Sequence, residues 1–201
     1  SQIGEILHDY PTTIFHVDGT QAIGKIPVCL DNIDLYSMSC HKFYGLKGVG
    51  CLIKKSNIEI EAMIHGGKSQ TIYRSGTPAT PLIASISKAL RLVSSDIDKH
   101  YEYVTMINKK VRERLELLER VKINSPNDAL PYILNISVIG VKPETMLHAL
   151  ENYDIYISTQ TACSSKSDES KAVLALTKDS ERSKSSVRIS LSKLTFFKSI
   201  P

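Results

Sequence analysis

The chain has 201 residues, of which 42% are hydrophobic and 23% charged, and its formal net charge is +4. This length is enough for one large domain or two small ones with a buried core. Lysines and arginines are scattered rather than gathered in one block, so we expect no nucleic-acid surface. No stretch approaches the length of an uninterrupted apolar membrane span, and the first residues lack the pattern of a secretory signal.

The cysteines are few and widely spaced, at positions 29, 40, 51 and 163. None belongs to a C-x-x-C pair, so the sequence predicts neither a zinc site nor a disulfide scaffold. This usage is typical of a reducing compartment, and we place the chain in the cytoplasm. Cys29, Cys40 and Cys51 lie in or beside apolar runs, which predicts that they pack in the core.

Short apolar runs predict buried strands in the first part of the chain. They are rich in β-branched and aromatic residues, are bounded by turn residues, and cover residues 14–17, 34–38 and 49–53. Polar residues follow the first two runs directly. In open α/β sheets, ligands bind outside the C-terminal ends of the strands, so we expect a site there.

A long helical stretch is predicted to start at Thr80 and Pro81, with Thr80 as N-cap. Apolar residues recur at helical spacing as far as residue 118, with a break at 94–96. Beyond it, helices are predicted from residues 143 and 170, a polar loop at 158–168, and strands at 121–124, 133–139, 155–157 and 187–191. This alternation indicates an α/β fold.

Two segments at predicted strand ends carry the residue types that pyridoxal phosphate requires. The first contains Asp18 and Gln21, and the second is Ser39-Cys40-His41-Lys42. A partly buried lysine has a lowered pKa, which suits a Schiff-base nucleophile, and an aspartate can pair with the pyridinium nitrogen. Alone, the first segment is typical of a turn or helix cap and the second of a polar loop. Together they favour a cofactor site.

The pairing of Asp18 with Lys42, followed by the glycine-rich turn at 45–50, resembles the fold-type I enzymes of aminotransferase class V. Further segments are similar to motifs of the cysteine desulfurases: His65-Gly66-Gly67, Arg74-Ser75-Gly76-Thr77, Thr159-Gln160-Thr161-Ala162-Cys163-Ser164-Ser165 and Val187-Arg188-Ile189-Ser190-Leu191. The resemblance implies the C-terminal part of the large, cofactor-binding domain over residues 1–80. It implies a small C-terminal α/β domain with the cysteine loop over residues 81–201.

The resemblance also implies how pyridoxal 5'-phosphate would be held. Lys42 would be linked covalently to the cofactor, Asp18 would pair with its pyridine nitrogen, and Gln21 would donate to its phenolic oxygen. The remaining cofactor-binding residues would contact phosphate. Ser39 and His41 would bind the phosphate of the cofactor held by their own chain, and Thr77 would bind that of the other subunit in a dimer.

Substrate and sulfur chemistry are implied for two residues of the second part. Arg188 would clamp the carboxylate of L-cysteine in a bidentate pair. Cys163 would act as a thiolate, attack the substrate sulfur and become a persulfide, with L-alanine as the other product. The polar loop 158–168 suits a cysteine that must move. The sulfur would pass to an acceptor protein such as an iron–sulfur scaffold.

The chain also departs from the pattern of that family. Gln160 and Thr161 stand where the family loop often has glycine, and Lys68 stands where a third glycine is common. The phosphate loop, ring-stacking histidine and asparagine that precede residue 15 in the family have no counterpart here. Two alternatives therefore stay open: a selenocysteine lyase or other class V aminotransferase, and a non-catalytic module that docks on a longer homologue.

Overall fold

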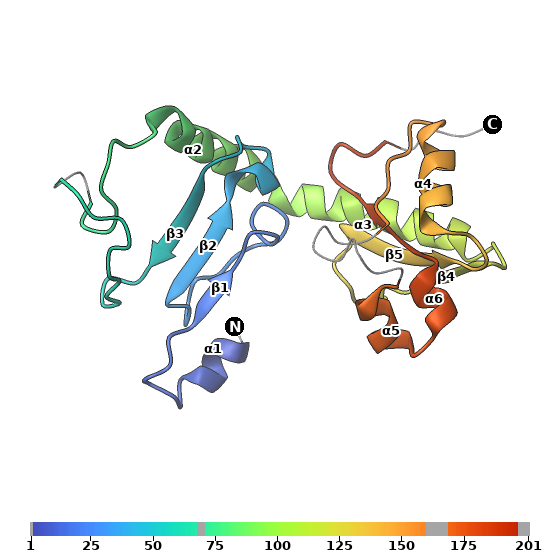
Figure 1. Cartoon of the computed structure of the whole chain (residues 1–201), viewed down its shortest axis with the longest axis horizontal. Coiled ribbons are helices and arrows are strands. Elements are labelled where there is room, and N and C mark those ends of the chain that lie inside the picture. The colour runs from blue at the N-terminus through green and yellow to red at the C-terminus, as the bar shows by residue number, and fades with distance from the viewer. Residues whose placement is uncertain (1, 68–70, 160–168, 197–201) are drawn as a thin grey trace. The chain divides into compact units, whose positions relative to one another are not determined.

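The computed structural model describes residues 2–67, 71–159 and 169–196. The chain divides into two compact units, Ser1–Asp98 and Lys99–Pro201, and each contains a three-stranded sheet among its described residues (Figure 1). The sequence predicts a boundary at residue 80, whereas the division falls after α2 (Thr80–Ser94). The helix belongs to the first unit because it buries Ala89 and Val93 in the core of that unit.

The first sheet has the strand order β1-β2-β3, and its members are β1 (His16–Asp18), β2 (Leu35–Ser39) and β3 (Gly50–Lys54). All the strands predicted for this region are present, shifted by one or two residues. β1 runs parallel to β2, with Asp18 opposite Ser37, and β3 runs antiparallel to β2. The parallel pair brings the residues that follow β1 and β2 to one edge of the sheet.

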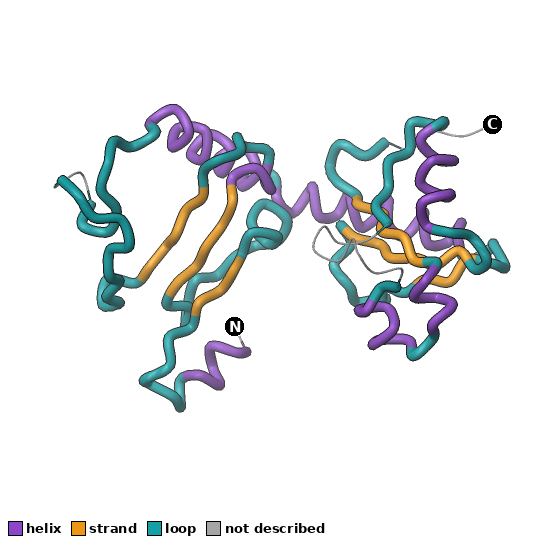
Figure 2. Tube along the Cα trace, in the orientation of Figure 1, coloured by secondary structure: helices purple, strands orange, loops and turns teal. Residues whose placement is uncertain are grey.

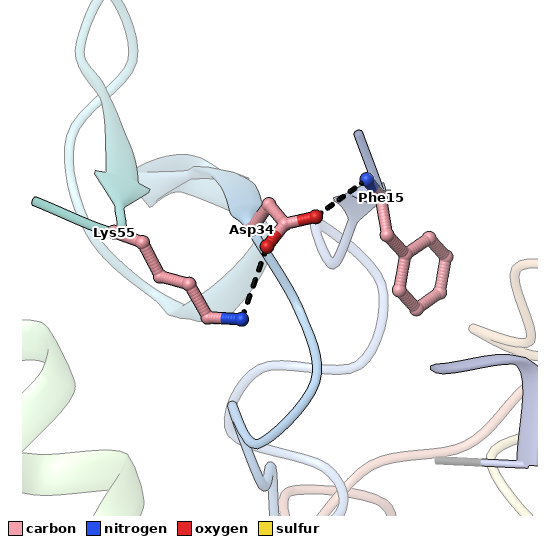
Figure 3. A network of polar contacts seen from close by, with 3 residues as sticks. All are labelled: Phe15, Asp34 and Lys55. Carbon is pink, nitrogen blue, oxygen red and sulfur yellow. Dashed lines mark hydrogen bonds and ion pairs between the residues drawn. The ribbon is translucent and has the colours of Figure 1, made fainter. Parts of the chain in front are cut away.

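Asp34 links the start of β1, the start of β2 and the end of β3, as Figure 3 shows. These strand ends form the edge of the sheet opposite to that of Asp18. Its Oδ2 accepts the Phe15 N–H at 2.9 Å, and its Oδ1 accepts from Lys55 Nζ at 3.0 Å. The Asp34 backbone also donates to Phe15 O and accepts from Lys55 N, both at 3.0 Å. These bonds hold the register of β1 on β2, and this register sets Asp18 beside the end of β2.

The core of the first unit lies beneath β2 and continues into η1 (Cys40–Phe43), a 3₁₀ turn where the sequence predicts a loop. Cys40 and Phe43 point inward and are essentially inaccessible to solvent, so His41 and Lys42 between them are exposed. A Cβ on Gly45 would overlap Cys40 Sγ. The chain can therefore turn tightly after η1 only because residue 45 is glycine.

The cysteines of the first unit have different environments. Cys40 is buried and Cys51 packs against the same core, so the predicted packing role is confirmed for both. Cys29 is exposed, and the prediction for it is wrong. Its neighbour Val28 takes the inward position instead. Cys163 lies outside the described residues.

The long helical stretch is two helices, α2 and α3 (Ile97–Leu115), and the predicted break between them is confirmed. Ala79 rather than Thr80 occupies the N-cap position of α2, and Pro81 lies in the first turn. A short helix, α1 (Gln2–Leu7), precedes β1. None of the helices within the described residues is long and apolar enough to cross a membrane.

The second unit is an antiparallel sheet, β4-β5-β6, with helices around it (Figure 2). α3 buries Val104 and Ile107 against residues next to the sheet. The strands are β4 (Val121–Ile123), β5 (Ile133–Val138) and β6 (Ser186–Ser190), and the remaining helices are α4 (Pro143–Glu151), α5 (Lys171–Thr177) and α6 (Ser180–Lys184).

The strand predicted at 155–157 does not form. Ile157 packs into the core behind β5, and backbone pairing in this region is a single isolated bridge between Ser158 and Arg188. The apolar run therefore reflects burial rather than membership of the sheet.

Helix α6 is not predicted from the sequence. It begins at a cap in which Asp179 accepts from the Glu181 and Arg182 N–H groups.

Candidate active site

Asp18 ends β1 and carries an exposed carboxylate at the C-terminal edge of the first sheet. Its Oδ1 accepts the Thr20 N–H at 3.0 Å. The hydroxyl and the N–H of Thr20 lower the pKa of Asp18 below its usual value, and nearby His16 adds a smaller effect in the same direction. The carboxylate is therefore ionised at neutral pH, as pairing with a protonated ring nitrogen requires.

The turn after Asp18 requires glycine at position 19. The Gly19 backbone lies against the buried Tyr36 ring, whose hydroxyl donates to Gly19 O at 3.3 Å. A Cβ on Gly19 would overlap that ring. Burial raises the pKa of Tyr36, and the charge on Asp18 raises it further. Tyr36 therefore stays a neutral donor beneath the turn.

Gln21 and Lys25 lie on the same side of the next turn, where Ala22 N and Ile23 N donate to Gly19 O at 2.9 and 3.1 Å. Lys25 Nζ donates to both Gln21 O and Gln21 Oε1 at 3.1 Å. An ammonium has only donors, so it holds the oxygen of the carboxamide and leaves Gln21 Nε2 directed away. Gln21 can then donate to a ligand.

Lys25 is a site residue that sequence reasoning missed. The four-residue spacing from Gln21 is the signal that could have revealed it. Burial lowers the pKa of Lys25, and the charge of Lys42 lowers it further. The two ammonium groups therefore lie close enough to repel each other, which favours an anionic ligand beside them.

Lys42 lies on η1, which follows directly after Ser39 at the end of β2, and β2 is paired with the strand that carries Asp18. The sequence-based expectation of a partly buried lysine is wrong, because Cys40 and Phe43 take the inward positions and leave Lys42 exposed. An exposed amine is accessible to a ligand and can attack its carbonyl group as a nucleophile. His41 is likewise exposed.

The remaining predicted residues of the first unit are Ser39 and Thr77, and only Ser39 is placed at this sheet edge by the strand pairing. Ser39 is half-buried at the end of β2, within the same edge as Asp18. Thr77 is exposed in the irregular segment before α2. The structure thus brings together five predicted cofactor residues, Asp18, Gln21, Ser39, His41 and Lys42, at one sheet edge.

Arg188 lines a cavity of about 260 Å³ in the second unit. Its backbone pairs with Ser158 on one side, and Asn135 lies opposite it on β5. Its Nε is buried and has no hydrogen-bond partner among the described residues. A buried, unpaired cationic donor is costly unless a ligand accepts from it, so this cavity is suited to an anion.

The residues at the sheet edge fit pyridoxal phosphate in chemical type. An ionised carboxylate matches the ring nitrogen, a carboxamide N–H matches the phenolic oxygen, and an exposed amine matches the aldehyde. The Ser39 hydroxyl and the His41 imidazole can donate to phosphate. Every functional group of the cofactor has a complementary side chain here.

Comparison with known proteins agrees with this geometry. The family model for aminotransferase class-V matches residues 1–198. A NifS/IcsS protein homolog from Lactobacillus delbrueckii subsp. bulgaricus is 38% identical over 195 residues, covering 94% of this chain and 51% of that protein. The cysteine desulfurase IscS of Vibrio atlanticus is 38% identical over 188 residues, covering 90% of this chain and 46% of that protein.

The fold has a close counterpart among solved structures. A NifS-like protein from Rickettsia africae superposes with a TM-score of 0.82 at 30% identity, covering 97% of this chain and 52% of that one. The likeness confirms the fold class predicted from the sequence. The chain spans about half the length of the curated relatives it matches.

Proposed function

Because the chain belongs to the class-V aminotransferase family, we propose that it forms part of a pyridoxal-phosphate-dependent cysteine desulfurase. Such an enzyme converts L-cysteine to L-alanine and retains the sulfur as a persulfide. The observation that carries the proposal is the position of ionised Asp18 and exposed Lys42 at one edge of the first sheet. The names of the relatives, which include cysteine desulfurases, support the choice of reaction.

Pyridoxal phosphate, when bound, supplies a ring that withdraws electrons from the substrate carbon attached to it. Lys42 is the residue that attaches the cofactor. Asp18 keeps a proton on the ring nitrogen through its charge, and Gln21 Nε2 donates to the phenolic oxygen. Lys25 fixes that carboxamide through its oxygen. Ser39 and His41 are the donors to phosphate, and in a homodimer Thr77 reaches the phosphate of the other subunit.

Arg188 and Cys163 act on the substrate. Arg188 binds the carboxylate of L-cysteine, which satisfies its buried Nε. The Cys163 thiolate attacks the substrate sulfur, so that an S–S bond forms while the Cβ–Sγ bond of the substrate breaks. The electron pair of that bond and a proton end on the carbon that becomes the methyl group of alanine.

The persulfide then passes to a sulfur acceptor such as an iron–sulfur scaffold protein. A free Cys163 thiol, which the reaction requires, persists in a reducing compartment, and this supports a cytoplasmic location for the reaction. A cysteine on a polar loop meets this need, because it must receive sulfur in one place and release it in another.

Sulfur release from L-cysteine with a thiol reductant tests the function. Cys163→Ser should abolish sulfur transfer, because a hydroxyl forms no persulfide, while cofactor absorption stays. Cys29→Ser is the matched control, since Cys29 is an exposed cysteine of the first unit. An aminotransferase would tolerate both changes.

Two further results would indicate the alternative functions. Faster release of selenium from selenocysteine than of sulfur from cysteine would indicate a selenocysteine lyase. If the unaltered chain releases no sulfur and co-purifies with a longer homologue, it is a docking module.

A further inference from the structure

Asn135 and Arg188 face each other across β5 and β6, and both line the 260 Å³ cavity of the second unit. Directly opposed residues on antiparallel strands project from the same face of the sheet. Sequence motifs pointed to Arg188 alone. The hydrogen bonds behind Asn135 show that its side chain is held in one orientation.

Arg182 determines which way the carboxamide of Asn124 faces. Its Nε and Nη2 donate to Asn124 Oδ1 at 3.0 and 2.7 Å. A guanidinium has donors only, so the oxygen of Asn124 must face Arg182 and its Nδ2 must face away. Asn124 itself is buried, with 6% of its surface exposed.

The orientation of Asn124 determines that of Asn135 in turn. Asn124 Nδ2 donates to Asn135 Oδ1 and to Ser137 Oγ, both at 2.7 Å. Since Asn135 must present its oxygen to Asn124, its Nδ2 is the group left over. Among the described residues, Asn135 Nδ2 has no hydrogen-bond partner.

Within the described parts of the chain, two donors on cavity-lining side chains therefore lack acceptors, the Nε of Arg188 and the Nδ2 of Asn135. The side chains that line it in the described parts of the chain include no aspartate or glutamate. A carboxylate has two oxygens, and one donor can serve each of them. A neutral ligand would satisfy Arg188 less well, because charge-assisted bonds are the stronger ones.

We propose that Asn135 is a second substrate-binding residue, which donates from Nδ2 to the carboxylate that Arg188 binds. Asn124 and Arg182 are its positioning residues. The inference rests on the proposed function, because it names the substrate carboxylate as the ligand. It adds a contact that distinguishes a planar carboxylate from other anions, since the two donors come from adjacent strands at fixed spacing.

Titration of the ¹⁵N-labelled full chain with propionate tests the inference without cofactor or turnover. Propionate carries the carboxylate and carbon skeleton of cysteine. The side-chain NMR signals of Asn135 Nδ2 and Arg188 Nε should shift together along one saturation curve. Asn135→Ala should weaken propionate binding by about tenfold, the loss of one hydrogen bond to a charged group. Arg182→Met should weaken it by about threefold, since Asn124 can then turn over.

Asn127→Ala is the matched control, because Asn127 is exposed in the same unit and does not line the cavity. Backbone amide spectra of every variant verify that it folds. A shift of Arg188 Nε alone, with Asn135→Ala binding propionate as tightly as the unaltered chain, would overturn the inference. The absence of a shift at both groups would overturn it too. Neither result depends on cofactor attachment at Lys42, which tests the proposed function separately.

Discussion

Lys25 Nζ lies 3.1 Å from Gln21 Oε1. The ammonium group of a lysine that belongs to none of the recognised motifs therefore sets the orientation of Gln21, a predicted cofactor-binding residue. The same ammonium is affected by the charge of Lys42, which lowers its pKa in addition to the effect of burial. This relationship links two lysines at one sheet edge and leads to a direct test.

Replacement of Lys42 by alanine should raise the pKa of Lys25. Removal of a neighbouring cation favours the charged form of the remaining amine, while the effect of burial stays and keeps the pKa below the usual 10.5. NMR titration of the Lys25 side chain measures the change. Lys88→Ala, at an exposed position of α2, serves as control and should leave the Lys25 titration unchanged. An unchanged pKa in the Lys42 variant would mean that the amines do not interact.

Asp18→Asn should weaken pyridoxal phosphate binding by roughly tenfold or more, because a neutral amide cannot pair with a protonated ring nitrogen. Fluorescence titration with the cofactor measures the dissociation constant. Asp9→Asn, an exposed aspartate beyond α1, should bind like the unaltered chain. Equal affinity of the Asp18 and Asp9 variants would remove Asp18 from the cofactor site.

Asp34 should make the first unit sensitive to acid. The Phe15 N–H and then Lys55 lower the pKa of Asp34 below its usual 3.8, so the folded state favours the ionised form. The resulting stability is present above pH 3.8 and is lost as the pH falls through the lower folded pKa. Urea unfolding at several pH values should therefore show Asp34→Asn to be less stable at neutral pH and equal to the unaltered chain in strong acid. A difference independent of pH would contradict the account.

Gly19→Ala should destabilise the first unit by roughly 1–3 kcal/mol, since the added methyl group overlaps the Tyr36 ring and the surroundings are packed. Gly67→Ala is the control, because a Cβ there meets no atom. Urea denaturation compares the two. The Gly19 variant should also bind pyridoxal phosphate more weakly, since Asp18 moves with the turn. Equal stability of both variants would show that the turn tolerates a side chain.

Most strands, and the position of Asp18 and Lys42 at or just past strand ends, could be predicted from the sequence because both depend on local signals. An apolar run bounded by turn residues buries itself as a strand, and polar residues directly after two parallel strands must share an edge. Ile133–Val138 and the break between α2 and α3 follow from the same kind of pattern. Each of these features can be predicted from residues that are close together in the sequence.

Other features depend on contacts between distant segments. Lys42 is exposed because Cys40 and Phe43 point inward. The sequence of this segment is typical of a loop, and it does not indicate which of its side chains will be buried. Ile157 is buried against the second sheet without joining it. Asn124 and Arg182 are 58 residues apart, and their bond exists only once the fold brings them together. Periodicity carries no information on such pairs.

The central claim is that Lys42 binds pyridoxal phosphate covalently. The visible absorption spectrum of the purified chain with added cofactor tests it most directly, beside Lys42→Ala and the control Lys47→Ala, an exposed lysine of the following turn. We expect the absorption band of the lysine-linked cofactor in the unaltered chain and in the control, and its loss in Lys42→Ala. Absence of the band from the unaltered chain, or its persistence in Lys42→Ala, would contradict the claim.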